Sequence, residues 1–182
     1  LTATAPHAAA DALPWRWSTL DLAKQRAATI KAQGASFPWR TIRGHACSGY
    51  WPAGTAGMHI HADLPVAAIR HVSWTQDAAF ERDYALELLV ETARLWISIG
   101  FHDDVDGHFH LDGITGPDEY SAVVDDNIYT NLMARLNLRG AADAALRWPE
   151  QAAAMDVTDE EMKAWSMAAA AVAIPFDDIR QV

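Results

Sequence analysis

Residues 80–99 read FERDYALELLVETARLWISI, and this stretch decides the fold class of the chain. Its apolar residues recur about every 3.6 positions, which is the period of one face of an α-helix. These positions are Phe80, Tyr84, Leu88, Val90 or Glu91, Leu95 and Ile99. Gly100 follows, at the place where glycine commonly ends a helix. The stretch therefore predicts a long amphipathic helix that ends at Ile99.

Four further segments repeat apolar residues at helical spacing: 18–33, 55–74, 127–148 and 158–172. Pro65 should kink the second of them unless it is tolerated locally, and Gly140 should break the third. In the last one, Thr158 and Glu161 have the spacing of a capping box. Residues 1–17 show no clear period, so they predict an entering loop or a short turn.

Two segments predict structure other than helix. Residues 35–54 mix glycine and proline with aromatic residues, which predicts a long loop of the kind that carries function. Residues 107–112 alternate apolar and polar side chains and predict a short β-hairpin-like segment. Helices joined by alternately short and long loops predict an all-α domain built of helical hairpins.

Composition limits the class of function. The chain has 182 residues, 51% of them hydrophobic and 21% charged, which is typical of one globular domain. Its net charge of −10 argues against binding to nucleic acid or to an anionic membrane surface. Cys47 is the single cysteine, so no intrachain disulfide can form. No apolar run approaches the roughly 20 residues that span a bilayer. We therefore expect a cytoplasmic protein with no nucleic-acid and no membrane partner.

The segment TGPDEY at residues 115–120 is the strongest candidate for chemistry. Just before two acids, Asp118 and Glu119, Gly116 permits φ values that are closed to other residues, such as those of left-handed backbone, and Pro117 fixes its own φ. If Glu119 is partly buried beside Asp118, both effects raise its pKa. A carboxylic acid that stays protonated near neutral pH can donate to a departing oxygen, as glycoside cleavage requires. The residues alone leave a second interpretation open, in which Asp118 caps a turn and Glu119 is merely solvated.

Longer motifs resemble one known family. Residues 113–120 (GITGPDEY) and 125–134 (DDNIYTNLMA) resemble the catalytic segment of glycoside hydrolase family 65. Residues 37–41 (FPWRT), 47–56 (CSGYWPAGTA) and 59–63 (HIHAD) resemble a second block of the same family, in the same order. The family contains inverting phosphorylases, and some hydrolases, that act on α-linked glucosides such as trehalose, maltose and kojibiose. The resemblance extends over essentially the whole chain.

The resemblance implies a fold and a set of site residues. Residues 1–182 would be a single partial catalytic domain, part of an (α/α)6 barrel whose remainder would be its partner, with a possible homodimer in the full enzyme. Glu119 would be the general acid. The disaccharide-binding residues would be Trp39, Arg40, Trp51, Thr55, Asp118 and Tyr120. No cofactor is implied, although inorganic phosphate is a possible co-substrate.

Arg40 is the most informative departure from the family pattern. In several disaccharide phosphorylases of the family, an acid follows the tryptophan and contacts the acceptor sugar, whereas Arg40 follows Trp39 in this chain. Arginine offers donors only, so the resemblance is closer to the trehalose-acting branch. Two questions stay open: whether phosphate or water attacks the sugar, and whether the chain is instead a noncatalytic helical carbohydrate-binding or assembly fragment.

Histidine pairs suggest a metal site less well. His59 and His61 are two residues apart on a predicted helix, so they point to different faces. His108 and His110 can share one face of a strand, but no third ligand is evident from the sequence. We therefore predict no metal site. In the family pattern the position of His61 is usually asparagine.

Overall fold

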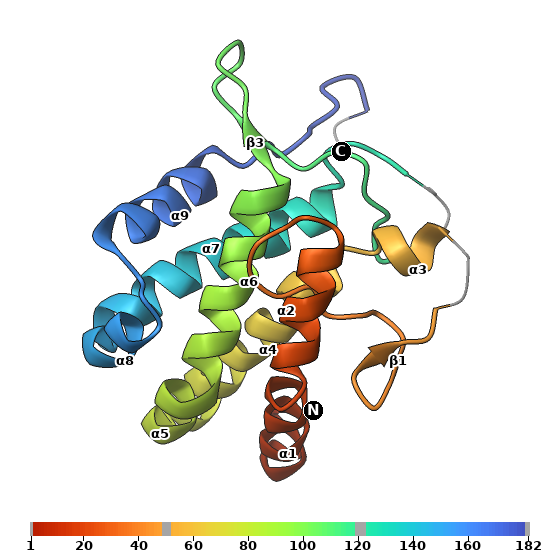
Figure 1. The fold of residues 1–182 in the computed structure, drawn as a ribbon. Helices are drawn as coiled ribbons and strands as arrows, with labels where there is room; N and C mark the ends of the chain where they lie inside the picture. The colour runs from red at the N-terminus through yellow and green to blue at the C-terminus, as the bar shows by residue number, and fades with distance from the viewer. Residues whose placement is uncertain (1, 49–51, 119–122, 181–182) are drawn as a thin grey trace.

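The computed structural model of the chain describes residues 2–48, 52–118 and 123–180. These residues form mainly helices (Figure 1): α1 (Pro6–Trp17), α2 (Leu20–Thr29), α3 (Pro52–Ala56), α4 (Ile60–Thr75), α5 (Ala78–Phe80), α6 (Leu86–Ile99), α7 (Ile128–Arg147), α8 (Pro149–Ala154) and α9 (Asp159–Ala171). A π-helical turn, η1 (Glu81–Ala85), joins α5 to α6. Two short antiparallel sheets pair β1 (Thr41–Ile42) with β2 (His45–Ala46) and β3 (Phe101–His102) with β4 (Phe109–His110). The helical class predicted from the sequence is confirmed.

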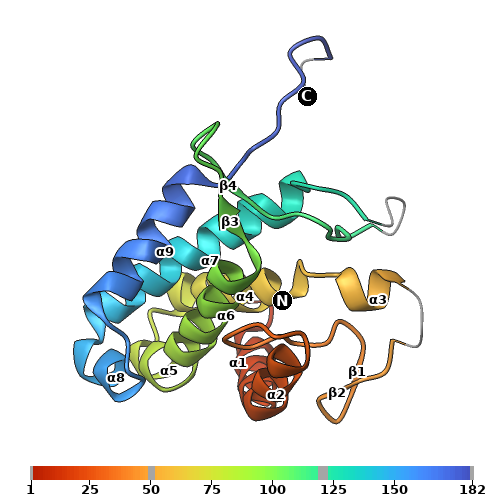
Figure 2. The same cartoon turned by 45° about the horizontal axis from the view of Figure 1, so that its top comes forward.

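Helix α6 forms the centre of the molecule. In Figures 1 and 2 it lies between α7 and α9 on one side and α1 and α2 on the other, with α4 behind it. Its buried residues run almost continuously from Leu86 to Trp96 and include Glu91 and Thr92. The helix is therefore buried around most of its circumference, and not on one face only. A helix that is surrounded in this way belongs to the core of a helical assembly.

Several sequence expectations about the helices were wrong. Residues 1–17 were expected to form an entering loop or a short turn, but α1 occupies most of them, beginning with Pro6 in its first turn and burying Ala9 and Leu13. Alanine favours helix yet adds little to an apolar pattern, so the periodicity was weak. Helix α7 is continuous through Gly140, which was expected to break it. A Cβ at that glycine would lie 2.6 Å from the Cδ1 atom of Ile69, so the residue serves the close packing of α4 on α7.

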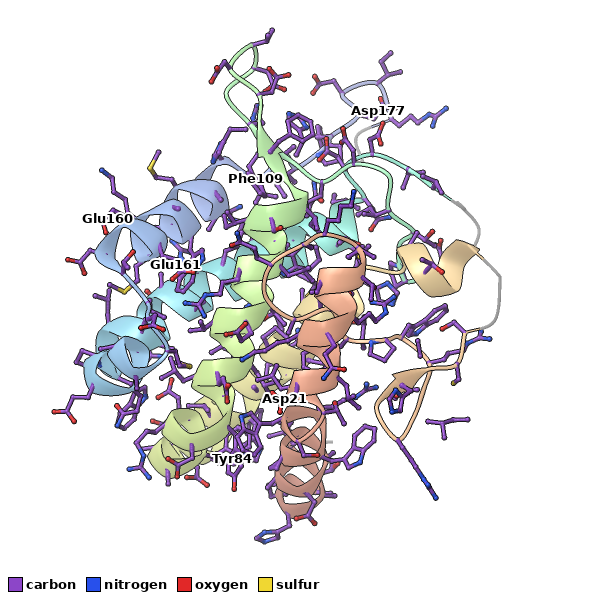
Figure 3. All side chains as sticks on the ribbon, viewed as in Figure 1. Asp21, Tyr84, Phe109, Glu160, Glu161 and Asp177 are labelled. Atoms are coloured by element: carbon purple, nitrogen blue, oxygen red, sulfur yellow. The ribbon has the colours of Figure 1, made fainter. Side chains whose placement is uncertain are left out.

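Gly100 also has a different role from the one predicted. It caps α6 with extended backbone angles (φ −93°, ψ 175°), whereas a helix-ending glycine of the predicted type is left-handed. A Cβ at this position would lie 2.3 Å from the ring of Phe109. The glycine therefore lets the β3–β4 hairpin fold back over the end of α6, where Figure 3 shows Phe109 at the base of the hairpin.

The β3–β4 hairpin begins earlier than the predicted segment 107–112. Phe101 pairs with His110, and His102 pairs with Phe109. The hairpin also contacts the segment that follows α9, because the Ala173 amide donates to the Phe109 carbonyl at 2.9 Å. It thus joins three regions: the end of α6, the start of the loop before α7, and the segment after α9.

Helix α7 carries an exposed apolar stripe. Ile128, Leu132 and Leu136 are spaced four residues apart and are 45%, 42% and 46% exposed. This spacing places them on one face of the helix. A part of a larger barrel would expose apolar surface of this kind, which the remainder of the barrel would cover. Within the described ranges, no helix is both long and apolar enough to cross a membrane.

Candidate active site

The loop between β4 and α7, residues 111–127, contains the predicted acidic motif and is closed at its neck by backbone pairing. Ile114 and Val124 exchange two backbone hydrogen bonds of 3.0 and 2.8 Å. The Asp126 amide donates to the Leu111 carbonyl at 3.0 Å. We call this segment the acidic loop. Its two ends are held together like the strands of a hairpin. We call the paired residues Leu111, Ile114, Val124 and Asp126 the neck of the loop.

Glu119 and Tyr120 lie outside the described residues, so their predicted roles stay predictions. Asp118 is described and exposed. Gly116 does not adopt the left-handed backbone that glycine permits. Within the described residues, the glycines with positive φ are Gly34, Gly44, Gly107 and Gly113. Its missing side chain makes room for Asn127, whose amide would lie 2.5 Å from a Cβ there. Asn127 in turn caps α7 by accepting from the Thr130 amide at 3.1 Å.

Asp126 is the main side-chain anchor of the neck. It has a left-handed backbone (φ 49°), which aspartate tolerates better than most residues. Its carboxylate accepts from the Leu111 amide at 3.2 Å, from Asn131 Nδ2 at 2.9 Å and from His110 Nδ1 at 2.6 Å. Burial raises the pKa of Asp126, but hydrogen bonds from His110, Asn131 and Leu111 outweigh that effect and leave the pKa lowered. The neck therefore holds a charged carboxylate.

His110 lies between two carboxylates. Its Nδ1 atom contacts Asp126, and its Nε2 atom lies 3.1 Å from an oxygen of Asp106. Carboxylates accept hydrogen bonds and do not donate them, so a ring protonated on both nitrogens suits this arrangement. The bond to Asp126 raises the pKa of His110, burial opposes this, and Asp106 adds to the rise. The contact ties β4 to both the hairpin turn and the acidic loop.

Two groups of side chains that could hold a metal ion share this histidine. Asp103, Asp106 and His110 form one group, and His110, Asp112 and Asp126 form the other. Asp112 has a raised pKa, first because of burial and then because Asp125 and Asp126 are close. The sequence did not predict the second group, because Asp126 lies sixteen residues after His110 and only the folded loop brings them together.

A second loop reaches the acidic loop through the backbone. Gly57 pairs with Thr115 as parallel strands do, and the Thr115 amide donates to the Ala56 carbonyl at 2.8 Å. Helix α3 ends at Ala56 and contains the exposed Thr55. The structure thus brings the stretch that contains Thr55 beside the stretch that contains Asp118. Trp51, the neighbouring candidate, lies outside the described residues.

Trp39 and Arg40 are held together near the start of α4. The guanidinium carbon of Arg40 lies 5.1 Å from the centre of the Trp39 ring, within cation–π range. The ring of Trp39 meets His59 edge to face, with centroids 5.6 Å apart and planes at 73°. Trp39 is half-buried and Arg40 is exposed. Hollows elsewhere on the described surface, such as that lined by Arg135, Arg139 and Asp143, contain neither residue.

His61 has a structural environment. It is buried, its Nε2 atom lies 2.9 Å from Ser36 Oγ, and its Nδ1 atom lies 2.7 Å from the Met58 carbonyl. Burial lowers the pKa of His61 to about 3, although the bond to Met58 opposes the change. A neutral imidazole can both donate and accept, so it satisfies both partners. His59 and His61 therefore serve different neighbours.

The helical scaffold joins the acidic loop to the segment 56–59, and His59 at the end of that segment contacts Trp39. An exposed carboxylate-bearing loop linked in this way to a tryptophan is compatible with a carbohydrate site in a helical domain. The family comparison agrees. A family model for the glycosyl hydrolase family 65 central catalytic domain matches residues 1–182. The chain belongs to this family, and the resemblance found in its motifs is confirmed.

Individual relatives support the same placement. An uncharacterized glycosyl hydrolase of Mycobacterium tuberculosis is 61% identical over 178 residues, covering 98% of this chain and 22% of that protein. An α,α-trehalose phosphorylase of Geobacillus stearothermophilus is 43% identical over 183 residues, covering 96% of this chain and 24% of the enzyme.

One solved structure, of a candidate kojibiose phosphorylase from the human microbiome, matches with a TM-score of 0.87 at 25% identity, covering 96% of this chain and 24% of that one. This likeness confirms the expected helical part-barrel fold. The chain spans about a quarter of the length of these relatives.

Proposed function

We propose that the protein containing this chain cleaves a trehalose-like, α-linked glucose disaccharide by inverting phosphorolysis, with Glu119 as the general acid. The observation that carries the proposal is the 43% identity to an α,α-trehalose phosphorylase over 96% of the chain. Identity to the candidate kojibiose phosphorylase is 25% over the same share. Residues 1–182 would form one part of a larger catalytic domain.

The proposed reaction is a single displacement at the anomeric carbon. Glu119 gives its proton to the glycosidic oxygen while the bond between that oxygen and C1 breaks. A phosphate oxygen forms the new bond to C1 from the opposite face, so the α-linkage becomes a β-linkage. The products are β-glucose 1-phosphate and one free sugar. Hydrolysis would instead need a second carboxylate about 6.5–9.5 Å from the acid, to activate water.

The described residues support this chemistry by holding the acidic loop. Backbone pairing of Ile114 with Val124 joins the two sides of the loop whose sequence contains Glu119, and pairing of Gly57 with Thr115 attaches one side of it to the segment 56–59. A general acid must lie within hydrogen-bond reach of the leaving oxygen. A loop whose two ends are held by backbone pairing is suited to that requirement. Asp118 and Tyr120 are proposed to orient the acid.

The sugar-binding residues are proposed from the second loop. Arg40 would donate to hydroxyls of the acceptor sugar, and Trp39 would hold its guanidinium group. Trp51 and Thr55 would complete the subsites. An arginine in place of an acid changes the site from hydrogen-bond acceptor to donor, which favours trehalose over maltose or kojibiose as substrate.

The apolar stripe of α7 and the thiol of Cys47 bear on the assembly and the location of the protein. We propose that the rest of the catalytic domain packs on the apolar stripe of Ile128, Leu132 and Leu136, and that the full enzyme forms a homodimer. The exposed thiol of Cys47 is compatible with a reducing cytoplasm, where we place the protein.

Product analysis tests the proposal in the protein at its natural length. Trehalose, maltose and kojibiose are each incubated with and without phosphate, and glucose and glucose 1-phosphate are measured, with the anomer read by proton NMR. We expect phosphate-dependent release of equal amounts of glucose and β-glucose 1-phosphate from trehalose. Glu119→Gln should lower kcat by at least about 100-fold, whereas the matched variant Asp118→Asn should lower it less.

Other outcomes would select a different function. Two glucose molecules per trehalose without phosphate would make the protein a hydrolase. Binding of disaccharide with no turnover under any condition would favour the noncatalytic carbohydrate-binding alternative. Unchanged turnover in Glu119→Gln would reject the assignment of the acid.

A further inference from the structure

We infer that His59 is a positioning residue: its buried imidazole holds the Trp39 indole, and through it the Arg40 guanidinium group, at the proposed acceptor subsite. The inference rests on the proposed function only where it identifies the subsite as the one that binds the acceptor sugar. The contacts themselves come from the fold. His59 would orient the proposed sugar-binding side chains without contacting the sugar itself.

The first step is the contact between the two rings. His59 is 4% exposed, and its ring meets Trp39 at a centroid distance of 5.6 Å and an angle of 73°. Aromatic rings prefer this edge-to-face geometry. Trp39 itself is only half-buried, so the core does not surround it. The imidazole therefore supplies a buried wall against which the indole is oriented.

The second step is the link from Trp39 to Arg40. The guanidinium carbon of Arg40 is 5.1 Å from the centre of the Trp39 ring. The planar guanidinium group stacks well on aromatic faces. Because Arg40 is exposed, the orientation of the indole helps to decide where its five donors point. A change in the tilt of Trp39 would move those donors.

The third step is the mounting of His59. Its carbonyl accepts from the amides of Ala62 and Asp63, both at 3.0 Å, so the residue is fixed to the first turn of α4. Three residues earlier, the Ala56 carbonyl accepts from Thr115 of the acidic loop. The short segment 56–59 therefore contacts the acidic loop through its backbone and Trp39 through its side chain. The two halves of the proposed site share one support.

His71 shows which features of His59 are general. It is also buried, its Nδ1 atom, like that of His59, has no hydrogen-bond partner among the described residues, and its ring meets Phe80 at 4.6 Å. Burial and an unpaired nitrogen are thus shared by both residues. What distinguishes His59 is the ring that it faces and the loop beside it. His71 lies on the same helix, about 18 Å further along at 1.5 Å per residue, and is a matched control.

The test separates positioning from folding. The natural-length protein is labelled with 5-fluorotryptophan, and Trp39→Phe assigns the Trp39 fluorine resonance. In the synthetic direction, we measure KM for free glucose as acceptor and KM for β-glucose 1-phosphate. We expect His59→Ala to shift or broaden the Trp39 resonance and to raise KM for the acceptor roughly 3- to 10-fold, the effect of losing one aromatic contact. KM for glucose 1-phosphate should not change.

Conservative and control variants complete the design. His59→Phe keeps an aromatic edge and should restore most of the acceptor KM, whereas His59→Gln should not. His71→Ala should lower stability but leave the Trp39 resonance and both KM values unchanged. If His59→Ala does not fold, the comparison of the Phe and Gln variants decides.

Two failures can be told apart. An unchanged Trp39 resonance in His59→Ala, or an acceptor KM equal to that of His71→Ala, would overturn the inference while Glu119→Gln still tests the function. If the wild-type protein shows no phosphorolysis, the proposed function fails, and the fluorine resonance still reports whether His59 holds Trp39.

Discussion

Replacing Asp126 with alanine should loosen the acidic loop at its neck. The carboxylate accepts three hydrogen bonds, from His110, from Asn131 and from the Leu111 amide. Its side chain is 19% exposed, so water replaces these contacts only in part. The substitution removes all three acceptances at once and leaves the backbone in a left-handed conformation (φ 49°).

The magnitude can be estimated from these contacts. A hydrogen bond to a charged group contributes about 1.5–3 kcal/mol, and leaving a buried partner unpaired costs a similar amount. Asn131 keeps its bond to the Ala173 carbonyl at 2.7 Å, and His110 can turn toward water or Asp106, so the sum is smaller than three full bonds. We therefore expect Asp126→Ala to destabilise the loop by about 2–4 kcal/mol. Asp126→Asn keeps an acceptor and the tolerance for left-handed backbone, so it should cost about 1–2 kcal/mol.

Hydrogen exchange of the natural-length protein measures this local free energy. Peptides covering residues 109–128 report the protected amides of Ile114 and Val124. A loss of 2–4 kcal/mol corresponds to a drop in protection of roughly 30- to 800-fold. The control is Asp125→Asn, because Asp125 is exposed and accepts the single Gly113 amide at 3.0 Å. If Asp126→Ala keeps its protection within about 3-fold of the wild type, the carboxylate does not hold the neck, and the reasoning is wrong.

Two further predictions follow from charge and from close packing. The folded-state pKa of His110 is raised, so its contribution to stability is complete below about pH 6.5 and is lost as pH rises through the raised pKa. The folded-state pKa of Asp126 is lowered, so its contribution to stability is lost as pH falls through the lowered pKa. Corrected for intrinsic exchange, protection of the neck should therefore fall as pH rises above about 6.5 and through the raised pKa of His110, and a wild-type slope that persists in His110→Gln would contradict this. Gly34→Ala should lower the free energy of unfolding by about 2–4 kcal/mol, because a Cβ there would lie 2.1 Å from the Glu91 carbonyl oxygen. Gly107 has the same sign of φ but open space around it, so Gly107→Ala should cost only about 1–2 kcal/mol in thermal or denaturant unfolding. Equal losses in the two variants would show that the backbone angle, and not the contact, sets the cost.

Capping residues in the sequence predicted the N-terminal ends of the helices that contain them. Thr158 accepts from the Glu161 amide at 3.1 Å, which confirms the predicted N-terminal end of α9. Helix α7 begins after Asn127, close to the predicted boundary. These features depend on residues three or four positions apart, so the sequence contains all the information that they need.

Expectations about glycine were less successful. Gly100, Gly116 and Gly140 were expected to permit unusual backbone angles or to interrupt a helix. In the structure each one makes room for a neighbour, and the neighbours are Phe109, Asn127 and Ile69. A sequence shows that a side chain is missing, but the element that fills the space comes from elsewhere in the chain.

For the candidate site, the motifs alone identified the family, the two loops and the residue types, because long motifs with a fixed order are specific. Only the tertiary structure showed that Gly57 pairs with Thr115, that His110 lies against Asp126, and that His59 lies behind Trp39. These pairs are separated by between 16 and 58 positions. Their contacts depend on how helices and loops pack, and no periodic pattern along the chain encodes that packing.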